Sequence, residues 1–473
     1  MFFNNKILVG KNDKNSSYIL PSKANRHGII SGASGSGKTI TLKVLAESFS
    51  SCGVPVFLVD VKGDLAGCAF AGSNNSNIEK RINNLDIKDF SFTNFPTIFW
   101  DVYGKCGHPI RTTVSSVGSI LLSRMLNLTV VQEGVLSIIF KIAEDEKLDI
   151  IDLKDLKSML NYVGEKRKEY SLSYGNITTQ SIGAIQRGIL SLEEEGGDLF
   201  FGSPSFELKD FIKFDCDTGQ GHINVLHADE LFKNPKMYST FLLWLLTTLY
   251  NEMPEVGDLD KPKLVFFIDE AHLVFDDMPD YLLDKIIQIV KLIRSKGIGL
   301  YFISQSPSDI PDPILSQLGN RIQHVLRYYT KSDEKAIKAA SDSFRDNPLF
   351  DTKEEIMKLA TGEALVSFQT EDGEPSIVEK VTILPPQSRM GTITSEERKD
   401  LIANSVFYNK YEEKIDHVSA FEKISDKKKE EPKEEKKSSK KKTKSEKMMD
   451  KFTNKVINTI GRKVGNSIFK LFK

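Results

Sequence analysis

The chain has 473 residues, which is enough for about three domains of ordinary size. Its 40% hydrophobic, 27% charged and 9% aromatic residues exclude a fibrous or wholly disordered protein. No apolar run approaches the roughly 18 residues that span a bilayer, and residues 1–10 contain no signal-peptide core. We therefore expect a cytoplasmic protein without a transmembrane helix. Four widely spaced cysteines, none in a C-x-x-C pair, favour structural thiols over a disulfide framework.

Apolar strand-like runs alternate with helix-like runs, which predicts an α/β fold with a mainly parallel sheet. Buried strands are predicted at residues 27–32, 54–60, 263–269 and 299–304. The gap between the second and third strands is rich in helical periodicity and predicts an inserted helical subdomain. The predicted organisation is a first half of the core at 1–105, the helical insertion at 106–220, a second half of the core at 221–390 and a helical extension at 391–425.

The formal net charge of −1 conceals two opposed segments, because residues 1–425 carry −11 and residues 426–473 carry +10. Residues 426–447 are almost all charged or polar, so they cannot offset their ordering entropy and predict a disordered linker. In residues 448–473, apolar side chains recur every four positions among lysines, which predicts a basic amphipathic helix. Three partners stay open for this helix: its own domain or a neighbouring subunit, a membrane surface, and nucleic acid.

Residues 32–39, GASGSGKT, fit the phosphate-binding pattern G-x-x-x-x-G-K-[ST] between a predicted strand and a predicted helix. Glycines let backbone N–H groups turn toward a phosphate, and the following helix N-terminus adds partial positive charge. We expect Lys38 to reach the β- and γ-phosphates and the Thr39 hydroxyl to ligate Mg²⁺. The predicted nucleotide-binding residues are Gly32, Ser34, Gly35, Ser36, Gly37, Lys38 and Thr39.

Hydrolysis of a nucleotide needs a second acidic element beside this loop. Asp269 and Glu270 follow the predicted strand 263–269, so Asp269 is expected to support Mg²⁺ and Glu270 to polarise the attacking water. The alternative is an acidic N-cap after a buried strand. A small-molecule kinase is less favoured than a hydrolase, because a kinase needs no glutamate beside the aspartate.

Gln305 follows the strand 299–304, where its amide could touch the γ-phosphate or the water; otherwise it is a polar residue leaving a strand. Asp60, Lys62 and Asp64 end another strand, at the edge where ligands gather. Contact with nucleotide, contact with a polymer and a plain turn remain open for them. His27 could line the nucleotide pocket, although a core or capping role is favoured.

Several longer stretches make the chain similar to a known family: NRHGIISGASGSGKT (25–39), GVPVFLVDVKGDLAG (53–67), residues 99–128, FFIDEAHLVF (266–275), residues 292–327 and GEALVSF (362–368). They resemble the HerA-like branch of the HerA/FtsK superfamily of P-loop ATPases, and within it bacterial ATPases with a HerA-like helicase C-terminal domain. The resemblance implies a RecA-like core, dependence on ATP and Mg²⁺, and a ring that is usually hexameric. It also implies DNA translocation or unwinding.

In such a ring, an arginine of one subunit completes the site of its neighbour, where its guanidinium offsets phosphoryl charge. The candidates from the matching region are Arg321, then Arg294, and also Arg327. Two functions follow: a DNA translocase or helicase-like ATPase, and a slow, nucleotide-switched ATPase whose tail binds a membrane surface or a protein.

Overall fold

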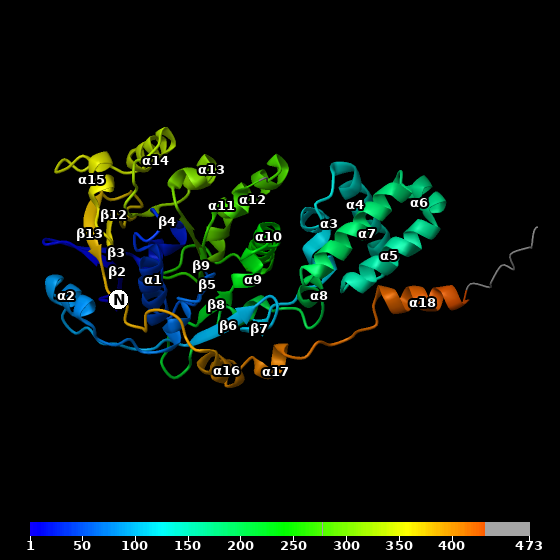
Figure 1. Cartoon of the computed structure of the whole chain (residues 1–473), viewed down its shortest axis with the longest axis horizontal. Helices are drawn as coiled ribbons and strands as arrows, with labels where there is room; N and C mark the ends of the chain where they lie inside the picture. The colour runs from blue at the N-terminus through cyan, green and yellow to red at the C-terminus, as the bar shows by residue number, and fades with distance from the viewer. Residues whose placement is uncertain (277, 431–473) are drawn as a thin grey trace, which may run out of the picture. The chain divides into compact units, whose positions relative to one another are not determined.

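One mixed β-sheet organises the described residues, 1–276 and 278–430, in the computed structural model (Figure 1). Within these residues the strand order is β1-β2-β13-β12-β11-β4-β10-β9-β5-β8-β6-β7, with β3 paired to β2. The parallel part consists of β4 (Gly28–Ser31), β5 (Val56–Asp60), β6 (Thr97–Asp101), β7 (His108–Pro109), β8 (Ile223–His227), β9 (Leu264–Ile268), β10 (Ile298–Ser304) and β11 (Asn320–Gln323). The antiparallel part consists of β1 (Phe2–Phe3), β2 (Lys6–Lys11), β3 (Ser16–Ile19), β12 (Glu363–Ser367) and β13 (Glu379–Ile383).

The central strands are apolar on both faces, because helices cover both sides of the sheet. In β9, Phe266 packs in one core cluster and Phe267 in the other, as expected when successive side chains point to opposite faces. On one side lie α10 (Pro235–Glu252) and α12 (Asp280–Leu292), and on the other lies α1 (Lys38–Ser51). The four strands predicted from continuous apolar runs, β4, β5, β9 and β10, are confirmed.

The strand β10 lies between β4 and β9, and all three run parallel. The carboxyl ends of parallel strands meet at one edge of a sheet, where open α/β folds bind their ligands. The segments that follow Ser31, Ile268 and Ser304 therefore leave the sheet side by side. This topology brings the predicted phosphate loop, the acidic pair and Gln305 to the same edge.

Between β7 and β8 the chain is mainly helical. This segment contains α3 (Val114–Met125), α4 (Val130–Asp145), α5 (Leu153–Glu165), α6 (Arg167–Tyr174), α7 (Thr179–Glu194) and α8 (Gly197–Phe200). Figure 1 shows α4 to α7 gathered to the right of the sheet. Their apolar side chains join those of α10 and one sheet face in a single core cluster. The predicted boundary at residue 106 assigns His108 and Pro109 to the insertion, whereas they pair with β6 as the last strand of the sheet.

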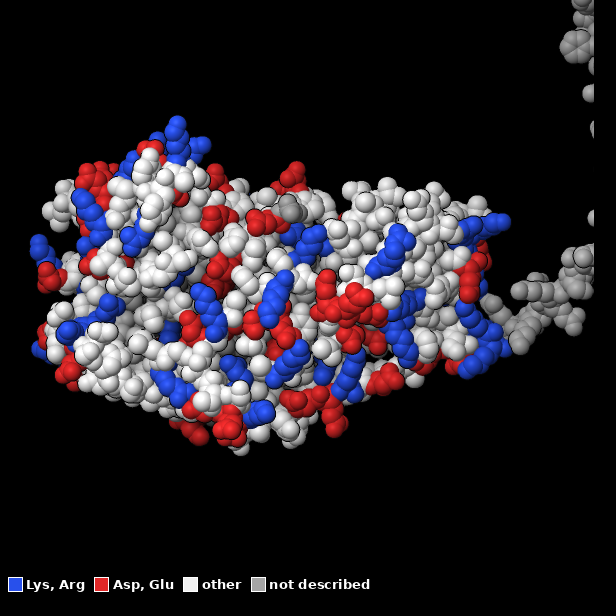
Figure 2. All heavy atoms as spheres, in the orientation of Figure 1, with Lys and Arg blue, Asp and Glu red and all other residues white. Residues whose placement is uncertain are grey.

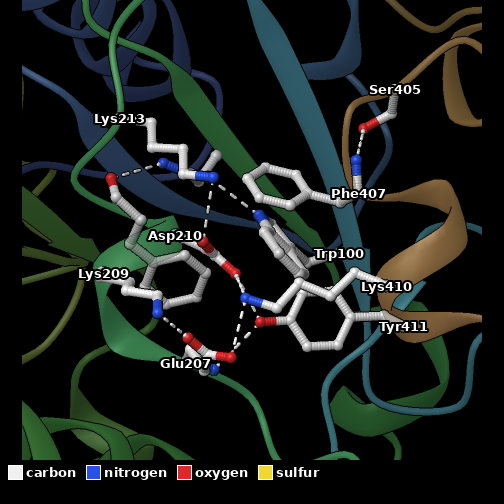
Figure 3. Close-up of polar contacts among 11 residues, drawn as sticks. Trp100, Glu207, Lys209, Asp210, Lys213, Ser405, Phe407, Lys410 and Tyr411 are labelled. Carbon is white, nitrogen blue, oxygen red and sulfur yellow. Dashed lines mark hydrogen bonds and ion pairs between the residues drawn. The ribbon is translucent and has the colours of Figure 1, made fainter.

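After β13 the chain runs back along the body as a segment that we call the strap, residues 385–424. The strap carries α16 (Ser395–Ala403), α17 (Tyr408–Tyr411) and the start of α18 (Ala420–Glu430). Figure 3 shows how α17 is held: the buried carboxylate of Asp210 accepts hydrogen bonds from Lys410 Nζ and the Tyr411 hydroxyl, both at 2.6 Å. Lys213 adds an ion pair to the same carboxylate at 3.2 Å.

The helix α18 continues to Glu430, into the segment 426–447 for which the sequence predicts disorder. Lysine and glutamate have high helix propensity, although they do not form a buried core. The run of charged residues therefore does not by itself end the helix. The rest of that linker and the predicted amphipathic helix at 448–473 lie outside the described residues. No helix in the described part of the chain is long and apolar enough to cross a membrane.

Shorter elements complete the described fold. They are α2 (Ser76–Asn84), α9 (Asp229–Phe232), α11 (His272–Phe275), α13 (Asp312–Leu315), α14 (Lys331–Asp342) and α15 (Thr352–Lys358). The helix α2 lies between β5 and β6, and it begins with Asn75, whose side chain accepts the N–H groups of Asn77 and Ile78. It forms one wall of a cavity described below.

Candidate nucleotide-binding site

The loop between β4 and α1 forms a turn that only glycine-rich sequence adopts without strain. Gly35 and Gly37 have φ values of +74° and +116°, in the region that favours glycine. The helix α1 begins at Lys38, so its free N–H groups face the loop. The loop borders a cavity of about 390 Å³, and Lys38, Thr39, Asp269 and Glu270 all line this cavity.

His324 forms the floor of the loop, a role that the sequence did not predict. Its ring Nδ1 lies 2.9 Å from the carbonyl oxygen of Glu363, and its Nε2 lies 2.8 Å from the Thr41 hydroxyl. Burial lowers the pKa of His324 to about 4, so the ring is neutral at physiological pH. A carbonyl only accepts, so Nδ1 carries the proton and Nε2 accepts from Thr41. A Cβ on Gly32 would lie 2.5 Å from the Cβ of His324, which requires glycine there.

The ammonium group of Lys38 lies inside the loop. It donates hydrogen bonds to the carbonyl oxygens of Gly32 and, at 3.2 Å, of Ala33. Burial lowers the pKa of Lys38, and the nearby carboxylates of Glu270 and Asp269 oppose that shift. The ammonium group of Lys38 therefore interacts electrostatically with Asp269 and Glu270. In this position a bound phosphate chain would neutralise the positive charge of Lys38.

Asp269 and Glu270 directly follow β9. The N–H of Glu270 donates to Asp269 Oδ1 at 2.9 Å, and the Tyr238 hydroxyl donates to the Asp269 carbonyl oxygen at 2.6 Å. Burial, together with the charge of Glu270, raises the pKa of Asp269 to about 6. Glu270 has a φ of +44°, which is rare and strained for a residue with a Cβ. Its Oε2 lies 3.5 Å from Nδ1 of His272.

The residues of this cavity fit a nucleotide phosphate chain with Mg²⁺. The Ser36 hydroxyl is buried and has no hydrogen-bond partner in the described part of the chain, but it lies beside Gly32 and does not line the cavity. The hydroxyl of Thr39 and the carboxylate of Asp269 are hard oxygen donors of the kind that Mg²⁺ prefers. Lys38 supplies positive charge beside them.

Asp60 forms a turn, one of the three roles left open by the sequence. Its carboxylate accepts the N–H groups of Gly63, Leu65 and Ala66, at 2.8, 3.2 and 3.1 Å. Burial raises its pKa to about 6, and the charge of Asp64 adds to this shift. The turn directs Lys62 and Asp64 toward the phosphate loop, where both line the same cavity.

The remaining predicted residues do not line this cavity. Gln305 is exposed just beyond the end of β10. His27 is buried at the start of β4, where Nδ1 accepts from Leu300 N at 3.0 Å and Nε2 donates to Val290 O at 2.8 Å. It is therefore a core histidine, and the alternative of a histidine that lines the nucleotide cavity is wrong.

The candidate arginines also lie away from the phosphate loop of their own chain. The Arg321 guanidinium donates to the carbonyl oxygens of Leu318 and Leu315, at 3.1 and 3.2 Å, in the segment that precedes β11. Arg294 borders a separate cavity of about 420 Å³, together with Lys23, Arg26 and His27. Arg327 is exposed after β11.

A parallel sheet with a glycine-rich phosphate loop at its carboxyl edge, and an acidic pair after a strand two positions away, defines a P-loop nucleotide-binding protein. The family described as "Helicase HerA-like C-terminal" matches residues 5–468, and the chain belongs to this family. The resemblance predicted from the sequence is thereby confirmed.

Relatives by sequence include the DNA double-strand break repair helicase HerA of Saccharolobus solfataricus, which is 24% identical over 76% of this chain and 64% of its own length. HerA of Sulfurisphaera tokodaii is 26% identical over 72% of this chain and 62% of its own length. A probable helicase of Methanocaldococcus jannaschii is 33% identical over 26% of this chain and 22% of its own length. The chain thus spans less than two thirds of the length of these relatives.

Two solved structures share the fold at low identity. The bacterial conjugative coupling protein TrwB matches with a TM-score of 0.51 and 16% identity, over 80% of this chain and 89% of its own. VirB4 of Thermoanaerobacter pseudethanolicus matches with a TM-score of 0.50 and 15% identity, over 84% of this chain and 99% of its own. These likenesses confirm the predicted RecA-like α/β core.

Proposed function

We propose that the chain binds ATP with Mg²⁺, hydrolyses it, and couples turnover to movement along DNA or to DNA unwinding. The observation that carries this proposal is the convergence of Lys38 and Thr39 with Asp269 and Glu270 in one cavity. The family relatives named as DNA repair helicases support the DNA part of the proposal. A TrwB structure described as a complex with ADP and Mg²⁺ supports the choice of cofactors.

Four residues of the cavity, Lys38, Thr39, Asp269 and Glu270, have roles in this proposal. Mg²⁺, when bound, neutralises phosphate charge and orients the phosphate chain. Thr39 and Asp269 would hold the ion, and Lys38 would bind the β- and γ-phosphates. Glu270 would orient the attacking water and accept its proton, because its carboxylate is half-buried beside Lys38.

An arginine from a neighbouring copy would complete the site. The Arg321 guanidinium donates to carbonyl oxygens of Leu318 and Leu315 and does not line the cavity of its own phosphate loop, so in this proposal it acts on a second molecule. Arg294 likewise lies in a cavity apart from its own loop. We therefore propose a homo-oligomeric ring, with Arg321 or Arg294 as the residue that reaches the adjacent site.

Replacement of Glu270 by glutamine tests hydrolysis. We expect ATP binding to persist and turnover to fall by about 100-fold or more, since the amide cannot accept the proton. Glu169→Gln, an exposed change on α6, is the matched control and should keep full activity. Equal turnover in Glu270→Gln and wild-type protein would contradict the role of Glu270.

The DNA part needs its own measurement. Figure 2 shows basic and acidic side chains interspersed over one face of the molecule, with no continuous basic band on that face. A DNA motor should nevertheless hydrolyse ATP faster with DNA, and this stimulation should weaken as salt rises. DNA stimulation that survives truncation after residue 425 would favour the motor, because the +10 tail is then removed.

The contrast between the acidic residues 1–425 and the basic residues 426–473 favours a second candidate. This candidate is a nucleotide-switched ATPase whose basic tail binds a membrane surface or a protein. Sedimentation with anionic liposomes distinguishes the two. Binding to liposomes that depends on residues 426–473, without DNA stimulation, would favour the switch over the motor.

A further inference from the structure

A second cavity, of about 770 Å³, adjoins the phosphate-loop cavity. The two cavities share Gly37, Ile40 and Thr361 in their linings. The wall of the second cavity that faces away from the loop comes from α2, the end of β13 and the start of the strap. A ligand whose phosphates lie on the loop would therefore extend into this space past Gly37.

The lining of this cavity combines apolar surface with polar and charged side chains, among them Asn77, Asn84 and Arg81. Ile78 on α2, Ile383 on β13 and the buried Pro385 and Pro386 of the strap supply the apolar surface. Its volume is within the range of small-molecule sites. This chemistry suits a flat heteroaromatic ring that carries polar edges.

Arg81 is one of four charged residues in the lining, with Lys11, Asp13 and Lys80, and its guanidinium lies beside Gly362, next to the shared residue Thr361. Its guanidinium lies so close to Gly362 that a Cβ on that glycine would be 2.6 Å from one guanidinium nitrogen. The N–H of Gly362 in turn donates to the Ser36 carbonyl oxygen, at 3.1 Å, within the phosphate loop. Arg81 is thus linked to the loop through a single residue.

The guanidinium of Arg81 has donors to spare. Within the described residues it makes one hydrogen bond, from Nη1 to the Ile383 carbonyl oxygen at 3.2 Å. No carboxylate lies within ion-pair distance of Arg81 among residues 1–276 and 278–430. The side chain of Arg81 is half-buried, and this burial lowers its pKa while the charge of Glu363 opposes the shift. A partly buried guanidinium with unused N–H groups is suited to acceptor oxygens and nitrogens of a ligand.

We propose that this cavity binds the ribose and base of the nucleotide whose phosphates occupy the loop, and that Arg81 is the residue that favours a nucleoside phosphate over a bare polyphosphate. This assignment rests on the proposed nucleotide-binding function and adds a recognition subsite to it. Arg81 donates to acceptor atoms of the nucleoside, while Ile78, Ile383 and Pro386 pack against the ring.

Two ligands distinguish the nucleoside subsite from the phosphate site: ADP, which carries a nucleoside, and inorganic tripolyphosphate, which does not. Each is titrated with Mg²⁺ into the full chain, and its affinity is measured by calorimetry. We expect Arg81→Ala to weaken ADP binding by about tenfold or more and to leave tripolyphosphate binding unchanged. The ADP affinity of Arg81→Lys should lie between those of the wild type and Arg81→Ala, because lysine keeps the charge but not the planar guanidinium. Arg187→Ala, an exposed change on α7, is the matched control and should alter neither affinity.

The outcomes are distinct. If Arg81→Ala lowers the affinities for ADP and tripolyphosphate equally, Arg81 only supports the phosphate loop. If it lowers neither affinity, the nucleoside lies elsewhere. Each result overturns the inference. Lys38→Ala should lose both ligands. If it does while Arg81→Ala changes nothing, the proposed function stands and the subsite falls. A wild-type chain that binds neither ligand overturns the proposed function and the subsite with it.

Discussion

The carboxylate of Glu47, on the helix that follows the phosphate loop, accepts hydrogen bonds from the N–H, at 3.1 Å, and the hydroxyl of Ser388 in the strap. It also accepts the N–H of Gln387 at 2.8 Å. One turn earlier on α1, Lys43 donates to the Arg389 carbonyl oxygen at 2.6 Å. Both α1 side chains are buried, so the strap is fixed to the helix that begins in the phosphate loop.

Replacement of Glu47 by alanine should destabilise the protein by about 3 kcal/mol, because two N–H groups and a hydroxyl lose their acceptor in the interior. The unfolding midpoint, measured by circular dichroism or calorimetry, should fall by several degrees. Glu169→Ala, at an exposed position, controls for the loss of a glutamate and should leave the midpoint unchanged. Identical midpoints for Glu47→Ala and the control would remove Glu47 from this role.

Asp210 should determine how firmly the strap is docked. Burial acts to raise its pKa, but the hydrogen bonds from Lys410 and Tyr411 and the ion pair with Lys213 hold it below the ordinary value, so the carboxylate is charged. Asp210→Asn should expose the strap to trypsin, with faster cleavage within residues 385–424. Glu207→Gln alters a more exposed ion pair to the same Lys410 and should change cleavage little. Equal cleavage rates in both variants would refute this role of Asp210.

The strained backbone of Glu270 predicts a trade of stability against activity. Its φ of +44° costs a residue with a Cβ about 1 kcal/mol or more, whereas glycine adopts it freely. Glu270→Gly should therefore raise the unfolding midpoint slightly and abolish ATP turnover. Glu270→Gln retains the strain and should lose turnover without gaining stability. A glycine variant less stable than the glutamine variant would show that the conformation is not strained.

His27 should make the fold sensitive to acid. Burial lowers its pKa to about 4 from 6.5, so the unfolded chain binds the proton more readily than the folded chain between these values. The stability that neutral His27 provides is complete above pH 6.5 and is lost as pH falls toward 4, to a maximum of about 3 kcal/mol. His27→Gln should be less stable at pH 7.5 but lose less stability on acidification. Parallel pH profiles for the variant and the wild type would contradict this.

The sequence predicted the parts of the site that are contiguous in the chain. The glycine loop and the acidic pair each directly follow a continuous apolar run, so strand, turn and helix can be located without tertiary information. By contrast, β11 has the polar sequence NRIQ and β8 is interrupted by Asn224, so neither forms a continuous apolar run. Their polar side chains are buried because they form hydrogen bonds with groups far away in the sequence, such as the bond from Asn224 Nδ2 to the Val56 carbonyl oxygen at 3.1 Å.

The residues that sequence analysis missed or misplaced depend on contacts across the chain. His324 beneath the loop could have been noticed within the stretch 292–327, but nothing local distinguishes it from the core histidine His27. Arg81 lies on a short polar helix that looks like a solvated surface element. Only the approach of that helix to Gly362 makes the arginine a candidate ligand-binding group.

The sequence alone determined that this protein has a P-loop, an acidic pair and a parallel sheet, because these features arise from local periodicity and from the φ values that glycine permits. The tertiary structure decided which side chains meet: β10 inserted between β4 and β9, the strap tied to α1, and α2 placed beside the loop. The physical reason is that burial and hydrogen bonding between segments far apart in the chain leave little trace in the composition of either segment.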